Sequence, residues 1–103
     1  MMDRTHSVTV DGVGTFVFRR RAMRDQIRIE ADAVRILGGP IEDDGLRSWA
    51  LAMATLAALT VSAPDGWDLD TIDPLDEGAT AKVLMVYGRL RETEEKFRKG
   101  TGA

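Results

Sequence analysis

The sequence predicts a mainly α-helical, α+β fold, in which a short amino-terminal β-hairpin precedes three main helices packed as a small bundle. Two short runs of β-branched and aromatic residues flank a glycine-containing turn, and the rest of the chain shows apolar residues at helical spacing. The chain has 103 residues, of which 44% are hydrophobic and 30% are charged. This length and composition predict one globular domain spanning residues 1–103.

The hairpin is expected over residues 7–18. Residues 7–10 (Ser-Val-Thr-Val) and 15–18 (Thr-Phe-Val-Phe) have the composition of strands, and the Asp-Gly pair and second glycine at 11–14 suit a tight turn. Because an isolated two-stranded ribbon is only marginally stable, one of its faces must pack on helices or on another chain.

The first helix is predicted over residues 20–37 and is amphipathic, with two glycines after it that suit a left-handed C-terminal cap. The stripe expected to face the core recurs at three- and four-residue intervals and comprises Met23, Ile27, Ala31, Val34 and Leu37. A second apolar face, formed by Ile29, Ala33 and Ile36, lies off that stripe. A helix with two apolar faces either sits between core elements or offers one face to a partner, and because a small domain has few elements to cover both, Ile29, Ala33 and Ile36 are a candidate contact surface.

The second helix is predicted over residues 40–62 and is apolar nearly all round, which is typical of the most buried element of a bundle. The last helix is predicted over residues 74–98, with Asp73 as its N-cap. Acid–base pairs at spacing four, such as Glu94 with Arg98, are expected to stabilise its second half. Both ends of the chain are expected to fray.

The residue types that most catalytic and metal sites need are missing. The chain has no cysteine, which excludes disulfides, thiolate metal sites and thiol nucleophiles, and its single histidine, His6, has no second histidine to pair with. We therefore expect no enzymatic activity, no catalytic or metal-binding residues and no cofactor. His6 is expected at the surface.

No segment of the sequence predicts membrane insertion or export. The first seven residues are polar and lack the basic start and apolar run of a secretory signal. The longest apolar stretch, residues 49–61, is shorter than the roughly 20 residues needed to span a bilayer. The expected location is therefore the cytoplasm.

Five arginines gather between the end of the hairpin and the first turns of the first helix: Arg19, Arg20, Arg21, Arg24 and Arg28. Three interpretations stay open, namely a solvated face whose long stems cover apolar surface, a nucleic-acid contact, and a protein contact. The formal net charge of −3 and the aromatic content of 6% disfavour nucleic acid.

Six acidic residues fall between positions 65 and 77 without a lysine or arginine among them: Asp65, Asp68, Asp70, Asp73, Asp76 and Glu77. The spacing does not fit a calcium loop, because Ala79 stands where the bidentate glutamate belongs. A solvated loop with helix-capping acids explains the run better. Trp67, in the same loop, is either a lid on the helices or an exposed anchor. Arginines at one end of the domain and Asp65, Asp68 and Asp70 at another would suit a head-to-tail interface between copies.

The order of these features resembles that of the small tail assembly chaperones of long-tailed bacteriophages and prophages. The resemblance is carried by Thr-Phe-Val-Phe-Arg-Arg-Arg (15–21), Asp-Gln-Ile-Arg-Ile-Glu-Ala (25–31), Val-Ser-Ala-Pro-Asp-Gly-Trp (61–67), Asp-Pro-Leu (73–75) and Glu-Glu-Lys-Phe-Arg (94–98). It rests on element order and dispersed short motifs, and not on a catalytic signature.

This resemblance, which covers residues 8–100, implies a non-enzymatic protein in the cytoplasm of the bacterial host. Such a chaperone binds the helical tape measure protein, keeps it soluble while tail tube protein polymerises around it, and self-associates into spirals or rings. A longer frameshifted form would recruit the tail tube protein. Two other classes stay open: a structural head–tail connector or minor tail component of the virion, and a small nucleic-acid-binding regulator.

Overall fold

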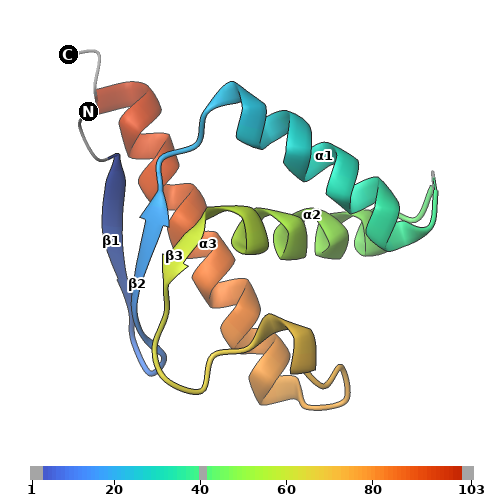
Figure 1. Cartoon of the computed structure of the whole chain (residues 1–103). Helices are drawn as coiled ribbons and strands as arrows, with labels where there is room; N and C mark the ends of the chain where they lie inside the picture. Colours follow the sequence, from blue (N-terminus) through green and yellow to red (C-terminus); the bar gives the residue numbers. More distant parts are fainter. Residues whose placement is uncertain (1–3, 40–41, 101–103) are drawn as a thin grey trace.

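The computed structural model describes residues 4–39 and 42–100, and within them the first two strands form the predicted hairpin. Strand β1 (Thr5–Val10) pairs antiparallel with β2 (Gly14–Arg19) (Figure 1). The turn is closed by the Val13 N–H, which donates to the Val10 carbonyl oxygen over 3.0 Å. Gly12, with φ of 77°, supplies the left-handed conformation that such a turn requires.

The two faces of the hairpin differ because side chains alternate along each strand. Val8, Val10, Phe16 and Phe18 point to one face and are buried. The opposite face carries small polar side chains such as Thr9 and Thr15, whose Oγ1 atoms lie 3.0 Å apart across the strands. One face of the sheet therefore supplies the core and the other contacts solvent.

A third strand, β3 (Thr60–Ser62), completes the sheet in the order β1-β2-β3. It was predicted as the end of the second helix, and that prediction is wrong because the helix ends at Leu59. Thr60 and Val61 are β-branched, and this segment pairs antiparallel with the free edge of β2. Tertiary pairing thus decides the conformation of residues that continue an apolar helical pattern.

The first two helices, α1 (Met23–Leu37) and α2 (Asp44–Leu59), lie side by side and antiparallel (Figure 1). The predicted end of α1 is confirmed: Gly38 adopts φ of 80° and its N–H donates to Arg35. The predicted start of α1 is too early, because α1 begins at Met23. Residues 42–43 of the predicted second helix are not helical, because α2 begins after Asp43, whose side chain accepts from the Leu46 N–H. The predicted start of the second helix at residues 40–41 lies outside the described residues.

The last helix, α3 (Glu77–Gly100), follows a short 3₁₀ turn, η1 (Leu69–Thr71). Asp76, and not Asp73, is its N-cap, since an Asp76 side-chain oxygen accepts from the Ala79 N–H over 3.1 Å. The Asp73 side chain accepts from the Leu75 N–H and so closes a turn that precedes the helix. The predicted helix therefore begins three residues too early.

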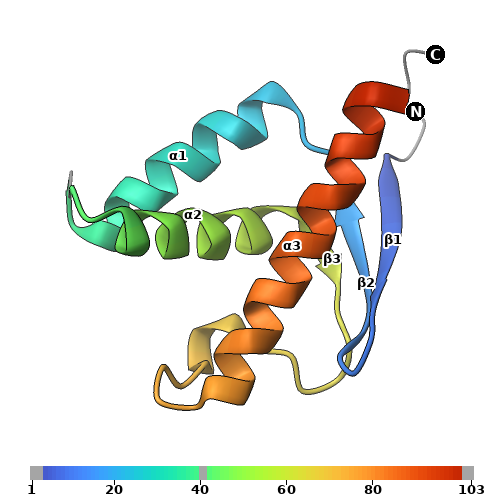
Figure 2. The ribbon, with the colours of Figure 1, turned by 180° about the vertical axis from the view of Figure 1, so that it is seen from behind.

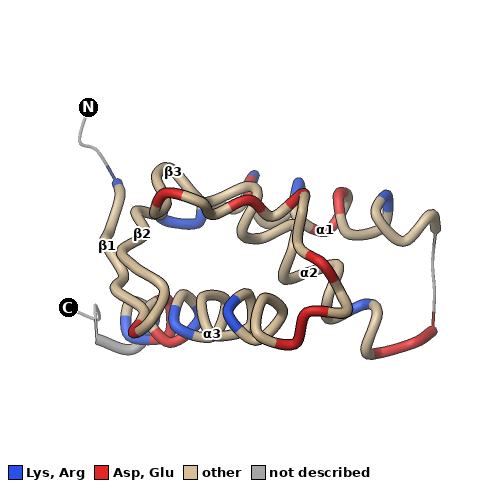
Figure 3. Tube along the Cα trace, turned by 90° about the horizontal axis from the view of Figure 1, so that it is seen from below, with Lys and Arg blue, Asp and Glu red and all other residues tan. Residues whose placement is uncertain are grey.

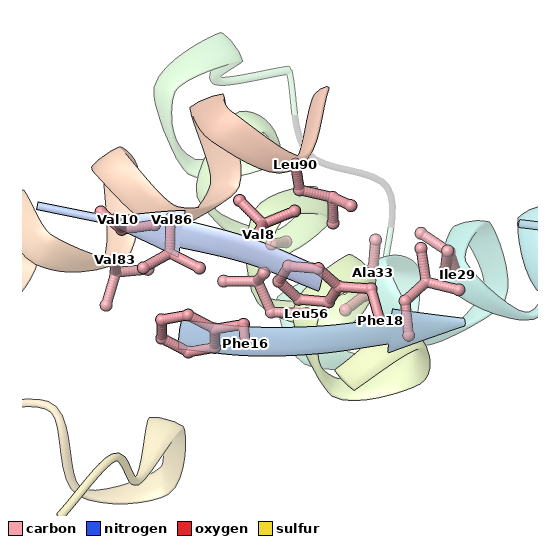
Figure 4. Packing of buried hydrophobic residues seen from close by; sticks show 13 residues of the cluster. Val8, Val10, Phe16, Phe18, Ile29, Ala33, Leu56, Val83, Val86 and Leu90 are labelled. Atoms are coloured by element: carbon pink, nitrogen blue, oxygen red, sulfur yellow. The ribbon is translucent and has the colours of Figure 1, made fainter. Parts of the chain in front are cut away.

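Helix α3 lies across the buried face of the sheet, as the reverse view shows (Figure 2). The core forms where this helix, the sheet, the buried face of α1 and the second half of α2 meet (Figure 4). Its largest fully buried side chains are Phe16, Phe18, Ile29, Leu56, Leu59 and Leu90. The predicted α+β fold class is confirmed. Helix α2 is buried only in its second half, because its first turns extend beyond the sheet with the end of α1 (Figure 1).

Within residues 4–39 and 42–100, no helix is both long enough and apolar enough to cross a lipid bilayer.

Candidate functional site

The face of α1 that was expected to contact a partner is largely part of the core. Ile29 is 1% exposed and Ala33 is 4% exposed, and both lie beside Phe18 (Figure 4). Ile36 lies seven residues beyond Ile29 on the same side of the helix, yet it is 56% exposed. It is exposed because this end of the α1–α2 pair projects beyond the sheet and α3 (Figures 1 and 2). The prediction that Ile29 and Ala33 contact a partner is therefore wrong.

Four of the five residues of the stripe that was expected in the core are instead exposed to solvent, whereas the fifth, Leu37, is half-buried against the core. Met23 is 74% exposed, Ile27 is 64% exposed and Val34 is 48% exposed, and Ala31 between them is also exposed. These four residues lie on the side of α1 opposite Ile29, and we call them the outer stripe of α1. A continuous apolar stripe over three helical turns is the usual surface with which a helix contacts another helix.

The buried face of α1 carries a charged residue, Asp25, beside Ile29 and Ala33. Asp25 is one turn before Ile29 on the buried face and is itself only 4% exposed. Its carboxylate accepts from the Ala22 N–H over 2.9 Å and from Arg19 over 2.6 Å. Burial acts to raise the pKa of Asp25, but the Ala22 N–H and the Arg19 guanidinium outweigh it and lower that pKa below its ordinary value. A charged residue can therefore occupy the core-facing side.

Three of the five clustered arginines are held by contacts within the chain. Arg19 donates to Asp25 and also to the Ala58 carbonyl oxygen, over 3.1 Å. Arg21 forms a two-pronged pair with Glu94, with its Nε and Nη2 each 3.0 Å from a carboxylate oxygen. The Arg20 guanidinium carbon lies 4.4 Å from the centroid of the Phe97 ring. These side chains join β2 and the start of α1 to α2 and α3.

The remaining two arginines are exposed and lie beside the outer stripe. Arg24 and Arg28 project from the same flank of α1 as Arg35, on one side of the stripe. Arg35 pairs with Asp32 over 2.6 Å, and Arg28 reaches the same carboxylate over 3.9 Å. Basic and acidic positions thus alternate along α1 (Figure 3). The apolar stripe with this basic flank is suited to a helix whose own apolar stripe has an acidic flank.

The acidic segment caps local structure, as expected, and it lies at the opposite end of α3 from Arg21. Asp68 accepts from the Asp70 N–H at the start of η1, while Asp65 and Asp70 are exposed. Asp76 and Glu94 are separated along α3 by about 27 Å. Between β3 and α3 every charged position is acidic (Figure 3).

Trp67 is a lid and not an exposed anchor. Its ring meets Phe16 edge-on with the centroids 4.9 Å apart, and its side chain is half-buried against the core. It also lines a surface pocket with Asp65 and Asp68. Asp70, which was predicted to form a head-to-tail interface together with Asp65 and Asp68, does not line this pocket.

His6 was expected at the surface, but it lies in an aromatic cluster with Phe18 and Phe97 that sequence reasoning missed. The His6 ring is half-buried, edge-on to Phe97 with centroids 4.9 Å apart and 6.0 Å from Phe18. Strand alternation carried the signal, because position 6 shares a face with Val8 and Val10. Glu94 pairs with Arg21 and Arg91, so the predicted Glu94–Arg98 pair does not form.

The residues that the structure describes contain no group of three or more His, Asp or Glu side chains placed to hold a metal ion. Comparisons with known protein families, with curated proteins and with solved structures gave no match.

Proposed function

We propose that this chain is a tail assembly chaperone of a long-tailed phage or prophage, which covers the apolar helical surface of the tape measure protein while the tail tube assembles. The sequence features that resemble this family support the proposal, as does the arrangement of one exposed amphipathic helix on a small α+β domain. Such an activity makes and breaks no covalent bond. It needs a surface that binds helices and releases them again.

The observation that carries the proposal is the exposure of the outer stripe of α1. Two of its side chains, Met23 and Ile27, are more than half exposed although they stand on a helix with a well-packed opposite face. Burying one side chain of this size against a client helix stabilises the complex by about 1.5–3 kcal/mol. A methionine in the contact also suits a client whose helices differ along its length, because its side chain adapts to irregular surfaces.

Self-association is the second part of the proposal. The exposed arginines Arg24 and Arg28 lie on α1, which starts near the carboxyl end of α3, while the acidic segment precedes the amino end of α3. Opposite charges on separate regions of one molecule favour head-to-tail contacts, which close into rings or continue as spirals. Charge reversal at Arg24 and Arg28 tests this contact more cleanly than reversal at Arg21, whose partner Glu94 is 13% exposed.

The test of function is co-expression with the tape measure protein of the same phage genome, followed by capture of the complex and by analytical ultracentrifugation. A Met23→Gln/Ile27→Gln variant is expected to lower client capture by tenfold or more, since two apolar contacts are lost. The matched control is Leu84→Gln/Met85→Gln, which alters two exposed apolar side chains of α3, 50% and 46% exposed. Equal capture by the wild type and the α1 variant would contradict the proposal.

Two further results would point to the other classes. Finding the chain as a stoichiometric component of purified virions would indicate a head–tail connector or minor tail protein. Binding to DNA with a steep salt dependence would indicate a nucleic-acid-binding regulator.

A further inference from the structure

A second surface, distinct from the outer stripe of α1, has the composition of an anion-binding pocket. It lies where the connection between β2 and α1 meets the last turns of α3, and its lining includes Arg20, Arg91 and Arg98. Arg21 and two glutamates complete the charged lining, so the pocket carries a formal charge of +2. The chain as a whole has a formal charge of −3, and this pocket is therefore a local exception.

The two glutamates of the pocket are already paired. Glu94 accepts from Arg21 through both carboxylate oxygens, and Arg91 donates to one of the same oxygens over 2.9 Å. Glu95 lies 3.6 Å from Arg98. These pairs fix the walls of the pocket and leave its excess positive charge uncompensated within residues 4–39 and 42–100.

Arg20 is the side chain that distinguishes this pocket from an ordinary surface ion-pair network. Within the described parts of the chain it makes no ion pair, and its guanidinium carbon lies 4.4 Å from the Phe97 ring centroid. The same ring also meets the ring of His6 edge-on, with the centroids 4.9 Å apart. Stacking on an aromatic ring orients the planar fork of a guanidinium and lowers the entropy lost when it binds a carboxylate.

We propose that this pocket binds carboxylate side chains of an acidic polypeptide segment, with Arg20 as the principal ligand. A carboxylate matches the two parallel donors of a guanidinium fork. Nucleic acid fits less well, because Phe97, already covered by Arg20 and His6, offers no free ring on which a base could stack. This inference does not depend on the proposed function.

The experiment is an NMR titration of the folded chain that follows the arginine Nε–Hε signals at low ionic strength, where charge interactions are least screened. The probe is a blocked tetraglutamate peptide, and blocked tetraglutamine is its neutral counterpart. The Arg20 signal is expected to shift and saturate with tetraglutamate only. The Arg20→Gln variant is expected to raise the dissociation constant for tetraglutamate about tenfold, because one charge-assisted contact is lost.

The matched control is Arg89→Gln, which removes one positive charge from an arginine that is 48% exposed on α3 and does not line the pocket. It is expected to change the dissociation constant less than about twofold. If both variants bound tetraglutamate equally weakly, or if the signals of all arginines shifted, overall charge would explain the binding and the proposal would be overturned. Binding of inorganic phosphate or a single-stranded oligonucleotide more tightly than the peptide would overturn the assignment to acidic polypeptide.

Discussion

The Arg19 guanidinium donates to the Asp25 carboxylate across an N···O distance of 2.6 Å, and this pair joins the end of β2 to the first turn of α1. The same Arg19 nitrogen also reaches the Ala58 carbonyl oxygen near the end of α2. One side chain therefore fixes three elements at the point where the helical pair leaves the sheet. The pair lies on the buried side of α1, opposite the outer stripe.

Replacing Asp25 with alanine is expected to lower the free energy of unfolding by about 2–3 kcal/mol. The change removes a buried acceptor and leaves both the Ala22 N–H and the Arg19 guanidinium without their partner. Arg19 is 47% exposed, so solvent limits the cost to less than that of a fully buried pair.

Urea denaturation measures this difference, with Asp32→Ala as the control. Asp32 also pairs with arginines on α1, but those arginines are 75% and 78% exposed. The Asp32→Ala control is expected to lower the free energy of unfolding by about 0.5 kcal/mol. If both variants lost the same stability, the Arg19–Asp25 pair would have no special structural role.

Local signals in the sequence predicted the hairpin, the Gly38 cap and the α+β class, because each depends on residues close together in the chain. The choice between the two faces of α1 required knowing that a charged residue of this helix is buried. Asp25 lies on the Ile29 face, and its burial is favourable because Arg19, six residues earlier in the chain, and the Ala22 N–H both pair with its carboxylate. The exposed apolar stripe therefore lies on the side of α1 opposite the face that was predicted to contact a partner.

The assignment of faces predicts opposite outcomes for two isoleucines two residues apart. Ile29→Ala removes a side chain that is 1% exposed and is expected to destabilise the fold by about 2–4 kcal/mol through the cavity that it leaves. Ile27→Ala alters a side chain that is 64% exposed and is expected to change the free energy of unfolding by less than about 0.5 kcal/mol. Thermal unfolding of both variants provides the measurement, and similar melting temperatures would refute the assignment.

His6 predicts a pH dependence of stability. Burial between Phe18 and Phe97 lowers the pKa of His6 below its ordinary value of 6.5, and Arg20 acts in the same direction while Glu94 opposes it. The unfolded chain therefore binds a proton at a higher pH than the folded chain. Stability should fall as the pH decreases from 6.5 toward the lowered pKa, and the loss should stop below it.

The variant that checks this dependence is His6→Phe, whose ring fits between two other aromatic rings. Neither ring nitrogen of His6 has a hydrogen-bond partner within the described residues, so the substitution is expected to raise stability by about 1 kcal/mol near neutral pH. Chemical denaturation over a pH series should show a smaller decline for the variant than for the wild type. Parallel pH curves for the two proteins would show that His6 does not contribute.

Two glycines are expected to respond in opposite ways to alanine. Gly14 opens β2 with φ of 140°, and a Cβ atom there would lie 2.9 Å from the Cβ of Pro64 and closer still to its Cγ. Strain and overlap together are expected to cost about 2–4 kcal/mol in Gly14→Ala.

Gly88, in the middle of α3, has open space around its position and no positive φ. Gly88→Ala is therefore expected to stabilise the helix by about 0.5–1 kcal/mol, because alanine loses less backbone entropy. Paired thermal unfolding tests both, and a destabilised Gly88→Ala chain would mean that this face of α3 is covered in solution.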